Sequence, residues 1–248
     1  MNITVKNTIY FLILIGIASC NPKDCFESTG TIIQKEITVP IFDKINVGNE
    51  VSLIIKQGVT QKVILETGTN LINDVTAEVV DGKLFITDTN SCNLTRDYAV
   101  TKVYVTSPNI TEIRSNTARS ITSNGIINFS NLTLISEDFI EDALNIGDFN
   151  LHIENQSIKI ISNGSSIFTL NGTTTHLNIG FYSGSSRFIG SDLMATNVLV
   201  VQKSTNDMLI HPINRLEGDI FSIGDVISYN HPNIITITEH YTGKLIFI

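Results

Sequence analysis

The feature that most constrains the fold is a repeat of about twenty residues in the second half of the chain. The stretch Asn163-Gly-Ser-Ser-Ile-Phe168 returns as Ser183-Gly-Ser-Ser-Arg-Phe188. Repeats of this length are typical of solenoids, in which each unit buries its apolar side only by stacking on a neighbour. Aligning the copies on the large apolar residue after the turn, at intervals of 20, 20, 19 and 19 residues, gives Phe168, Phe188, Met208, Ile227 and Ile246, with two looser copies at Ile121 and Ile146.

The units have the pattern of β-strands. Short runs of alternating apolar and polar residues, at 157–161, 176–179 and 197–201, are separated by clusters of Gly, Asn, Ser and Asp. The Leu-x-x-Leu-x-Leu signature of leucine-rich repeats, which share this period, is missing. The pattern therefore predicts stacked β coils, with the five aligned residues forming one inward file.

The composition excludes some functions. The chain has 248 residues, with 16 basic against 24 acidic side chains, and its Lys and Arg residues form no cluster. A nucleic-acid surface needs such a cluster, so no nucleic-acid partner is expected. The absence of Trp and the 7% aromatic content suit long polar β surfaces better than an apolar small-molecule pocket.

The N-terminus has the features of a secretion signal. Lys6 precedes an apolar run over 9–17 that is too short to span a bilayer, and small residues follow it. The sequence Gly16-Ile-Ala-Ser-Cys20 resembles the bacterial lipobox, which implies that Cys20 is diacylated and becomes the mature N-terminus. A plain signal peptide with an incidental Cys is the alternative. We therefore predict a lipoprotein signal peptide at 1–19 and a lipidated tether at 20–30, since two acyl chains anchor a protein stably.

Two further cysteines, Cys25 and Cys92, lie in polar, loop-like contexts. A secreted protein meets an environment that permits disulfides, so we predict a Cys25–Cys92 bridge. Two free thiols, or metal binding with too few ligands, are the alternatives.

From Thr31 to Pro108 the chain reads as a series of strands. Val51, Leu53 and Ile55 alternate with polar residues, and Asp81-Gly82 between two apolar runs is a strong hairpin signal. The spacing is less regular than further on, so we expect 31–113 to be an irregular N-terminal part and 114–248 to be repeating coils of one domain, 31–248.

The order of these motifs resembles a known family. The chain is similar to the putative auto-transporter adhesin, head GIN domain family of secreted and lipid-anchored bacterial proteins, common in Bacteroidetes, from about Phe42 to the end. The resemblance implies an all-β, right-handed parallel β-helix. The residues that carry it are Phe42-x-x-Ile45-x-Val47, Val51-x-Leu53-x-Ile55-x-Gln57-Gly58, Val63-x-Leu65-Glu66, Asn70-Leu71, Asp81-Gly82-x-Leu84-x-Ile86, and Val103-Tyr-Val-Thr-Ser-Pro108-x-Ile110-x-x-Ile113, followed by the glycine-serine turns.

Two groups of residues have side chains that could bind a metal. The acidic group Glu137, Asp138, Glu141 and Asp142 offers oxygen ligands for calcium but lacks the spacing of known calcium motifs, so a solvated acidic loop is the favoured interpretation.

The pairs His211-Pro212 and His231-Pro232 lie twenty residues apart, so their imidazoles could share a metal if Asp219 or His240 supplied a third ligand. The alternative is a corner position beside a proline. No bound metal and no cofactor are predicted.

These features favour a non-catalytic, lipid-anchored protein of the cell envelope, at the outer membrane, facing either the periplasm or the outside. Its expected partners are the membrane, through the lipid, and a glycan or protein ligand on the β surface, as in an adhesin or a structural module. The alternative is a β-helix polysaccharide lyase or hydrolase. That chemistry needs at least two carboxylates and a basic residue in one groove.

Overall fold

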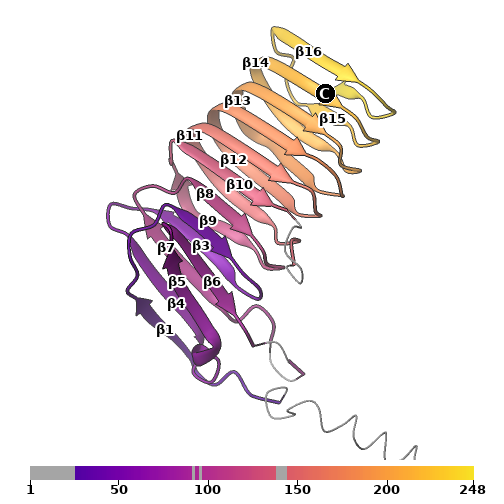
Figure 1. Ribbon diagram of the computed structural model, residues 1–248. Coiled ribbons are helices and arrows are strands. Elements are labelled where there is room, and N and C mark those ends of the chain that lie inside the picture. The colour runs from indigo at the N-terminus through magenta and orange to yellow at the C-terminus, as the bar shows by residue number, and fades with distance from the viewer. Residues whose placement is uncertain (1–25, 91–92, 95–96, 138–143) are drawn as a thin grey trace, which may run out of the picture.

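The computed structural model describes residues 26–90, 93–94, 97–137 and 144–248 (Figure 1). The seventeen strands in these ranges all join one sheet. The first ten are β1 (Ile32–Ile37), β2 (Lys44–Val47), β3 (Ser52–Gln57), β4 (Lys62–Gly68), β5 (Val75–Val80), β6 (Lys83–Asp88), β7 (Lys102–Ser107), β8 (Glu112–Ser115), β9 (Ile121–Ile127) and β10 (Asn131–Ser136). They are followed by β11 (Phe149–Ser162), β12 (Ile167–Phe181), β13 (Arg187–Gln202), β14 (Met208–Ile220), β15 (Val226–Ser228), β16 (Ile234–Glu239) and β17 (Leu245–Phe247).

The single helix among the described residues is the short 3-10 turn η1 (Ile72–Asp74). No helix in those ranges has the length and apolar character needed to cross a membrane.

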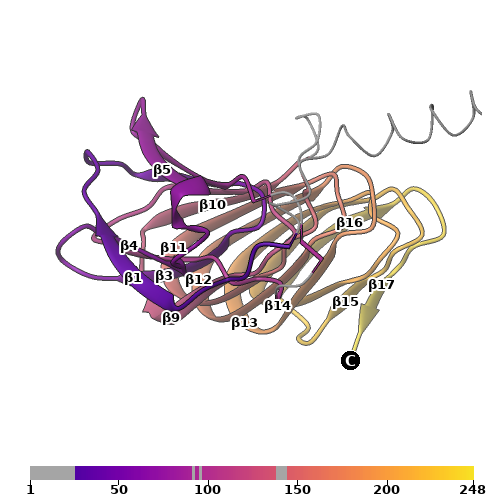
Figure 2. The same cartoon turned by 90° about the horizontal axis from the view of Figure 1, so that it is seen from below.

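The four long strands β11 to β14 pair in parallel, each beside the next in sequence (Figure 1). The outer two of the four, β11 and β14, also pair with short strands, and their first and last parts pair with different ones. The first part of β11 pairs with β9 and its last part with β10, while β14 pairs with both β15 and β16. The sheet therefore turns back on itself and wraps around an apolar core (Figure 2).

The core is built from files of apolar residues that follow the strand register. One file runs Leu84, Ile45, Ile113, Leu134, Ile160, Ile179 and Val200, all completely buried. A second file on the facing part of the sheet contains Phe149 and Phe168, whose rings stack at a centroid distance of 4.7 Å. Alternation of side chains along each strand gives one inward and one outward face, so these files form wherever the register is kept.

The prediction of an all-β fold is right, but the prediction of a right-handed parallel β-helix is wrong. The strands form a mixed, nearly closed, barrel-shaped sheet rather than a solenoid of parallel coils. β4 pairs antiparallel with both β1 and β7, and β5 pairs antiparallel with β6. In addition, β2 lies between β6 and β8, and β3 lies between β7 and β9, so strands 44–57 insert between two later units. Units coiled in sequence order would not give that arrangement.

The hairpin predicted at Asp81-Gly82 is confirmed. Val80 pairs with Lys83, and both turn residues have positive φ, 49° at Asp81 and 74° at Gly82. A two-residue turn of this kind matches the twist of antiparallel strands. This local signal already indicated an antiparallel pair, which a solenoid of parallel coils does not contain.

The predicted inward file is correct for three of its five members. Phe168, Phe188 and Met208 pair in register and are completely buried. The next partners are Val226 and Leu245, whereas Ile227 and Ile246 lie one residue further and face the other way. The step from Met208 to Val226 is only 18 residues, and Val226 and Ile227 are both apolar, so hydropathy could not choose between them.

Of the two looser copies, Ile121 belongs to this file through its pairing with Phe149, and Ile146 does not, since 52% of its surface is exposed.

The glycine-serine turns contribute a buried polar ladder beside the apolar files. Ser166 and Ser186, the last serines of the two turns, are completely buried and hydrogen-bond Ser136 and Ser162 at 2.8 and 2.7 Å. Ser185 instead lies outside and donates to the Ser165 hydroxyl at 2.9 Å. The turn chemistry seen in sequence thus also pairs polar groups inside the corner, where an unpaired hydroxyl would be costly.

The stacked file predicts unequal effects on stability from two residues of β13. Phe188→Ala should lower the free energy of unfolding by about 3–5 kcal/mol, because it removes a fully buried ring between Phe168 and Met208. Met194→Ala, which removes a side chain that is 48% exposed on the same strand, should cost less than about 1 kcal/mol. Chemical denaturation of both variants is the measurement, and equal losses would contradict the inward assignment of Phe188.

Candidate functional site

A shallow groove of about 420 Å³ lies on the outer face of strands β12, β13 and β14. Its residues alternate with buried ones. Leu177, Val198 and Leu216 point into the core and are at most 2% exposed, so their neighbours on either side point outward. The outward-facing residues that line the groove are His176, Asn178, Asn197, Leu199, Arg215 and Glu217, and the inward-pointing Leu177 and Val198 border it between them.

Strand register brings the polar members of the groove together. His176 pairs with Asn197, and Asn197 pairs with Arg215. One step along the strands, Asn178 pairs with Leu199, and Leu199 with Glu217. Neighbouring strands are about 4.8 Å apart, so each of these two rows crosses the groove in about 10 Å.

The charges of the groove are locally balanced. Arg215 Nη1 donates to Glu217 Oε1 at 2.6 Å, and both side chains are about two-fifths exposed. An exposed ion pair of this kind contributes little to stability, so stability alone does not explain its presence. Together with the amides of Asn178 and Asn197, the pair presents both donors and acceptors to solvent. Chemically, the groove can bind a polar, uncharged ligand.

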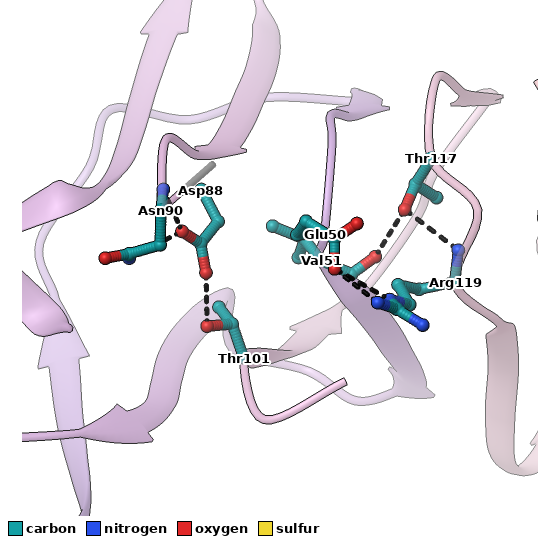
Figure 3. Close-up of polar contacts among 7 residues, drawn as sticks. All are labelled: Glu50, Val51, Asp88, Asn90, Thr101, Thr117 and Arg119. Carbon is teal, nitrogen blue, oxygen red and sulfur yellow. Dashed lines mark hydrogen bonds and ion pairs between the residues drawn. The ribbon is translucent and has the colours of Figure 1, made fainter. Parts of the chain in front are cut away.

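A second, smaller pocket of about 160 Å³ lies at the turns near β6 and β7, and Figure 3 shows the polar contacts around it. Asp88 is 6% exposed there. Its Oδ1 accepts from the Asn90 backbone N–H at 2.9 Å and from Asn90 Nδ2 at 2.6 Å, and its Oδ2 accepts from the Thr101 hydroxyl at 2.5 Å. Thr101 in turn shares a hydrogen bond of 2.9 Å with Thr67. The carboxylate therefore ties the end of β6 to the start of β7.

A neighbouring contact ties two further turns together (Figure 3). Arg119 forms an ion pair with Glu50, and its guanidinium carbon lies 5.6 Å from the centre of the Tyr98 ring. The Thr117 hydroxyl donates to the Val51 carbonyl at 3.2 Å and accepts from the Arg119 backbone N–H at 3.0 Å. Glu50 has a φ of 61°, an uncommon value outside glycine.

The small pocket is lined by the carboxylates Glu50, Asp88 and Asp97, and Arg119 lies beside Glu50, the kinds of residue that a polysaccharide-cleaving site would require. The bonding pattern argues against that use. Asp88 is buried and already accepts three hydrogen bonds, and Glu50 is paired with Arg119, so both carboxylates are engaged within the protein. The arrangement is that of a structural tie between turns.

The acidic residues considered for calcium fall mostly outside the described ranges. Asp138, Glu141 and Asp142 lie there, as do Cys20, Cys25 and Cys92, so the lipidation, the disulfide and this metal site stay predictions. Glu137 is described and accepts a hydrogen bond from Arg114 at 3.3 Å.

The histidines weighed as a shared metal site have separate partners. His211 Nδ1 contacts the Ser191 carbonyl at 2.9 Å, and the His231 ring packs on Phe247 with centroids 4.5 Å apart. His240 contacts Asp219 at 2.7 Å and stacks on Phe221. Within the described ranges, no three His, Cys, Asp or Glu side chains gather as a metal site.

Sequence reasoning missed the groove because the repeat is locally irregular there. His176 and Asn197 are 21 residues apart, and Asn197 and Arg215 are 18 apart, because the register shifts between β12, β13 and β14. An alignment at a constant twenty residues therefore does not bring the three together. The alternation of polar and apolar residues within each strand indicates which side chains face outward. It does not indicate which residues of the neighbouring strands lie beside them.

Comparison with known proteins identifies the family. Residues 41–232 match the family described as putative auto-transporter adhesin, head GIN domain. The chain belongs to this family. The resemblance predicted from the sequence is therefore confirmed. No curated protein matches the chain.

Solved structures of similar proteins share the fold. A putative adhesin from Bacteroides fragilis has a TM-score of 0.78 at 17% identity, covering 90% of this chain and all of that one. A putative adhesin from Parabacteroides merdae (TM-score 0.61, 14% identity) covers 89% of this chain and 98% of its own. A putative lipid binding protein from Parabacteroides distasonis has a TM-score of 0.60 at 16% identity, and the match covers 90% of this chain and 99% of that one. At these identities the likeness extends to the fold alone.

The tie at Asp88 gives a second prediction about stability. Asp88→Ala should lower the free energy of unfolding by about 2–3 kcal/mol, because the buried Thr101 hydroxyl and the part-buried Asn90 donors lose a charged acceptor. The matched control is Asp97→Ala, an exposed carboxylate lining the same pocket, expected to change stability by less than about 0.5 kcal/mol. Urea denaturation would measure both, and a neutral Asp88→Ala would show that the tie carries no stability.

Proposed function

We propose that the chain is a non-catalytic binding protein of the cell envelope that recognises its ligand on the outer face of β12 to β14. The observation that carries the proposal is the groove, where balanced charges and amide groups from three adjacent strands face solvent. Membership of a family described as adhesins supports a binding role.

The non-catalytic part of the proposal rests on bonding. The carboxylates best placed for acid-base chemistry, Asp88 and Glu50, are occupied in holding turns together. In the groove, Glu217 is the one carboxylate of the lining, and it is paired with Arg215. A glycosidase needs two carboxyl groups across its substrate.

A binding experiment with a groove variant tests this proposal. Full-length protein purified in detergent would be applied to panels of purified glycans and of host surface proteins. We expect at least one ligand to bind the wild type, and the double variant Arg215→Ala/Glu217→Ala to lose it, because the variant removes both charged groups of the groove without changing its net charge.

The control is Lys62→Ala/Glu36→Ala, which removes another exposed ion pair, on β4 and β1 and away from the groove. It should bind as the wild type does. Absence of any ligand, or equal binding by the groove variant, would refute the proposed site.

The proposal places the chain at the outer membrane, held by acyl chains on Cys20. The support is the sequence Gly16-Ile-Ala-Ser-Cys20 after a short apolar run. Metabolic labelling with a tagged fatty acid should mark the wild type and not Cys20→Ala. Equal labelling of the two proteins would end the claim of lipid attachment.

A further inference from the structure

An exposed aromatic ring lies on the same outer face as the groove. Tyr182 follows β12, is 50% exposed, and its phenol end covers Gly180. A methyl group in place of the Gly180 hydrogen would lie 2.7 Å from Tyr182 Oη and 2.8 Å from Cε2 and Cζ. Gly180 lies on the outward-facing side of β12, between Ile161 of β11 and Val201 of β13. It is nevertheless buried, because the tyrosine lies across it. The absence of a side chain at 180 is what lets the ring lie there.

The ring adjoins the groove. Gly180 is two residues from Asn178 on β12, a distance of about 7 Å along a strand, and side chains two apart share a face. Across the sheet, Gly180 pairs with Val201 while Asn178 pairs with Leu199, so the two positions belong to successive rows of one surface. The ring therefore covers the next outward position of β12 after Asn178. It borders the row Asn178–Leu199–Glu217 on the side away from the row His176–Asn197–Arg215.

This combination matches the chemistry of a sugar. A pyranose has C–H groups that pack on an aromatic face, whose electron density is negative, and hydroxyls that act as donor and acceptor at once. Tyr182 supplies the ring, and the amides of Asn178 and Asn197 with the Arg215–Glu217 pair supply both kinds of hydrogen-bonding partner. Because the ion pair is internally neutralised and the chain carries a net charge of −8, a neutral sugar fits better than an anionic one.

We propose that Tyr182 and the groove together form a binding subsite for neutral hexose units of a polysaccharide. The proposal rests on the function proposed above, and it adds the chemical class of the ligand and the residue that stacks on it. The groove is about 10 Å wide, so it has room for a short stretch of polysaccharide and not only for a single functional group.

The test uses full-length protein in detergent, titrated with laminarin, yeast mannan and arabinogalactan as neutral probes and alginate as an anionic one. We expect at least one neutral probe to bind the wild type more tightly than alginate does. Tyr182→Ala should weaken that binding at least tenfold, whereas Tyr182→Phe, which keeps the ring, should stay within about threefold.

Two further variants test whether the position of the Tyr182 ring matters and whether the effect is specific to this tyrosine. Gly180→Ala should weaken binding, because its new methyl group displaces the phenol while the tyrosine is retained. Tyr229→Ala removes another exposed tyrosine, 40% exposed after β15, and should bind within twofold of the wild type. Thermal unfolding of the tyrosine variants should stay close to that of the wild type, since these side chains lie on the surface. Gly180→Ala alters a buried position, so its circular dichroism spectrum should first show that it is folded.

The inference would be overturned if no neutral probe binds, if alginate binds most tightly, or if Tyr182→Ala binds as the wild type does. A protein ligand that needs Arg215 and Glu217 but not Tyr182 would also overturn it while leaving the proposed binding function intact. Loss of the function proposed above would instead appear as no ligand of either class responding to the groove variant.

Discussion

The parallel register between successive strands is the constraint on which the rest of this structure depends. Most residues of β12 lie beside the equivalent residues of β11 and β13, so one apolar position per strand becomes a continuous file through the core. Phe149, Phe168 and Phe188 are stacked in this way. The same hydrogen-bonded ladder sets the surface, because a strand that turns one side chain inward must turn the next outward. Core and groove are therefore two faces of one register, and a slip of one residue would exchange them.

The polar ties at the turns have a different role from the polar groups of the groove. Asp88 and the Glu50–Arg119 pair join segments that are distant in sequence and face each other at the N-terminal part of the sheet. Their hydrogen-bonding capacity is used within the protein. The Arg215–Glu217 pair joins residues two apart on one strand and ties no segments together. That contrast separates groups that hold the fold from groups available to a ligand.

The antiparallel N-terminal strands explain why the fold differs from a solenoid of repeated coils. Strands β2 and β3 pair with β8 and β9 on one side and with β6 and β7 on the other. Between β3 and β8 the chain forms antiparallel pairs, β4 with β7 and β5 with β6. Its strands β6 and β7 then pair with β2 and β3 on the side opposite to β8 and β9. Local alternation does not reveal such an excursion, because parallel and antiparallel strands with one buried face have the same period of two. The hairpin at Asp81-Gly82 was the one local sign of it.

The sequence by itself determined the all-β class, the hairpin, the twenty-residue stacking of Phe168, Phe188 and Met208, and the family, because each depends on residues close in the chain or on their order. It did not determine the mixed sheet, the place of strands 44–57 between later units, or the switch from Ile227 to Val226 in the inward file. The same holds for the groove and for the approach of Tyr182 to Gly180. Register shifts between strands decide which side chains meet, and those shifts arise from packing the whole sheet around one core, so only the tertiary structure contains them.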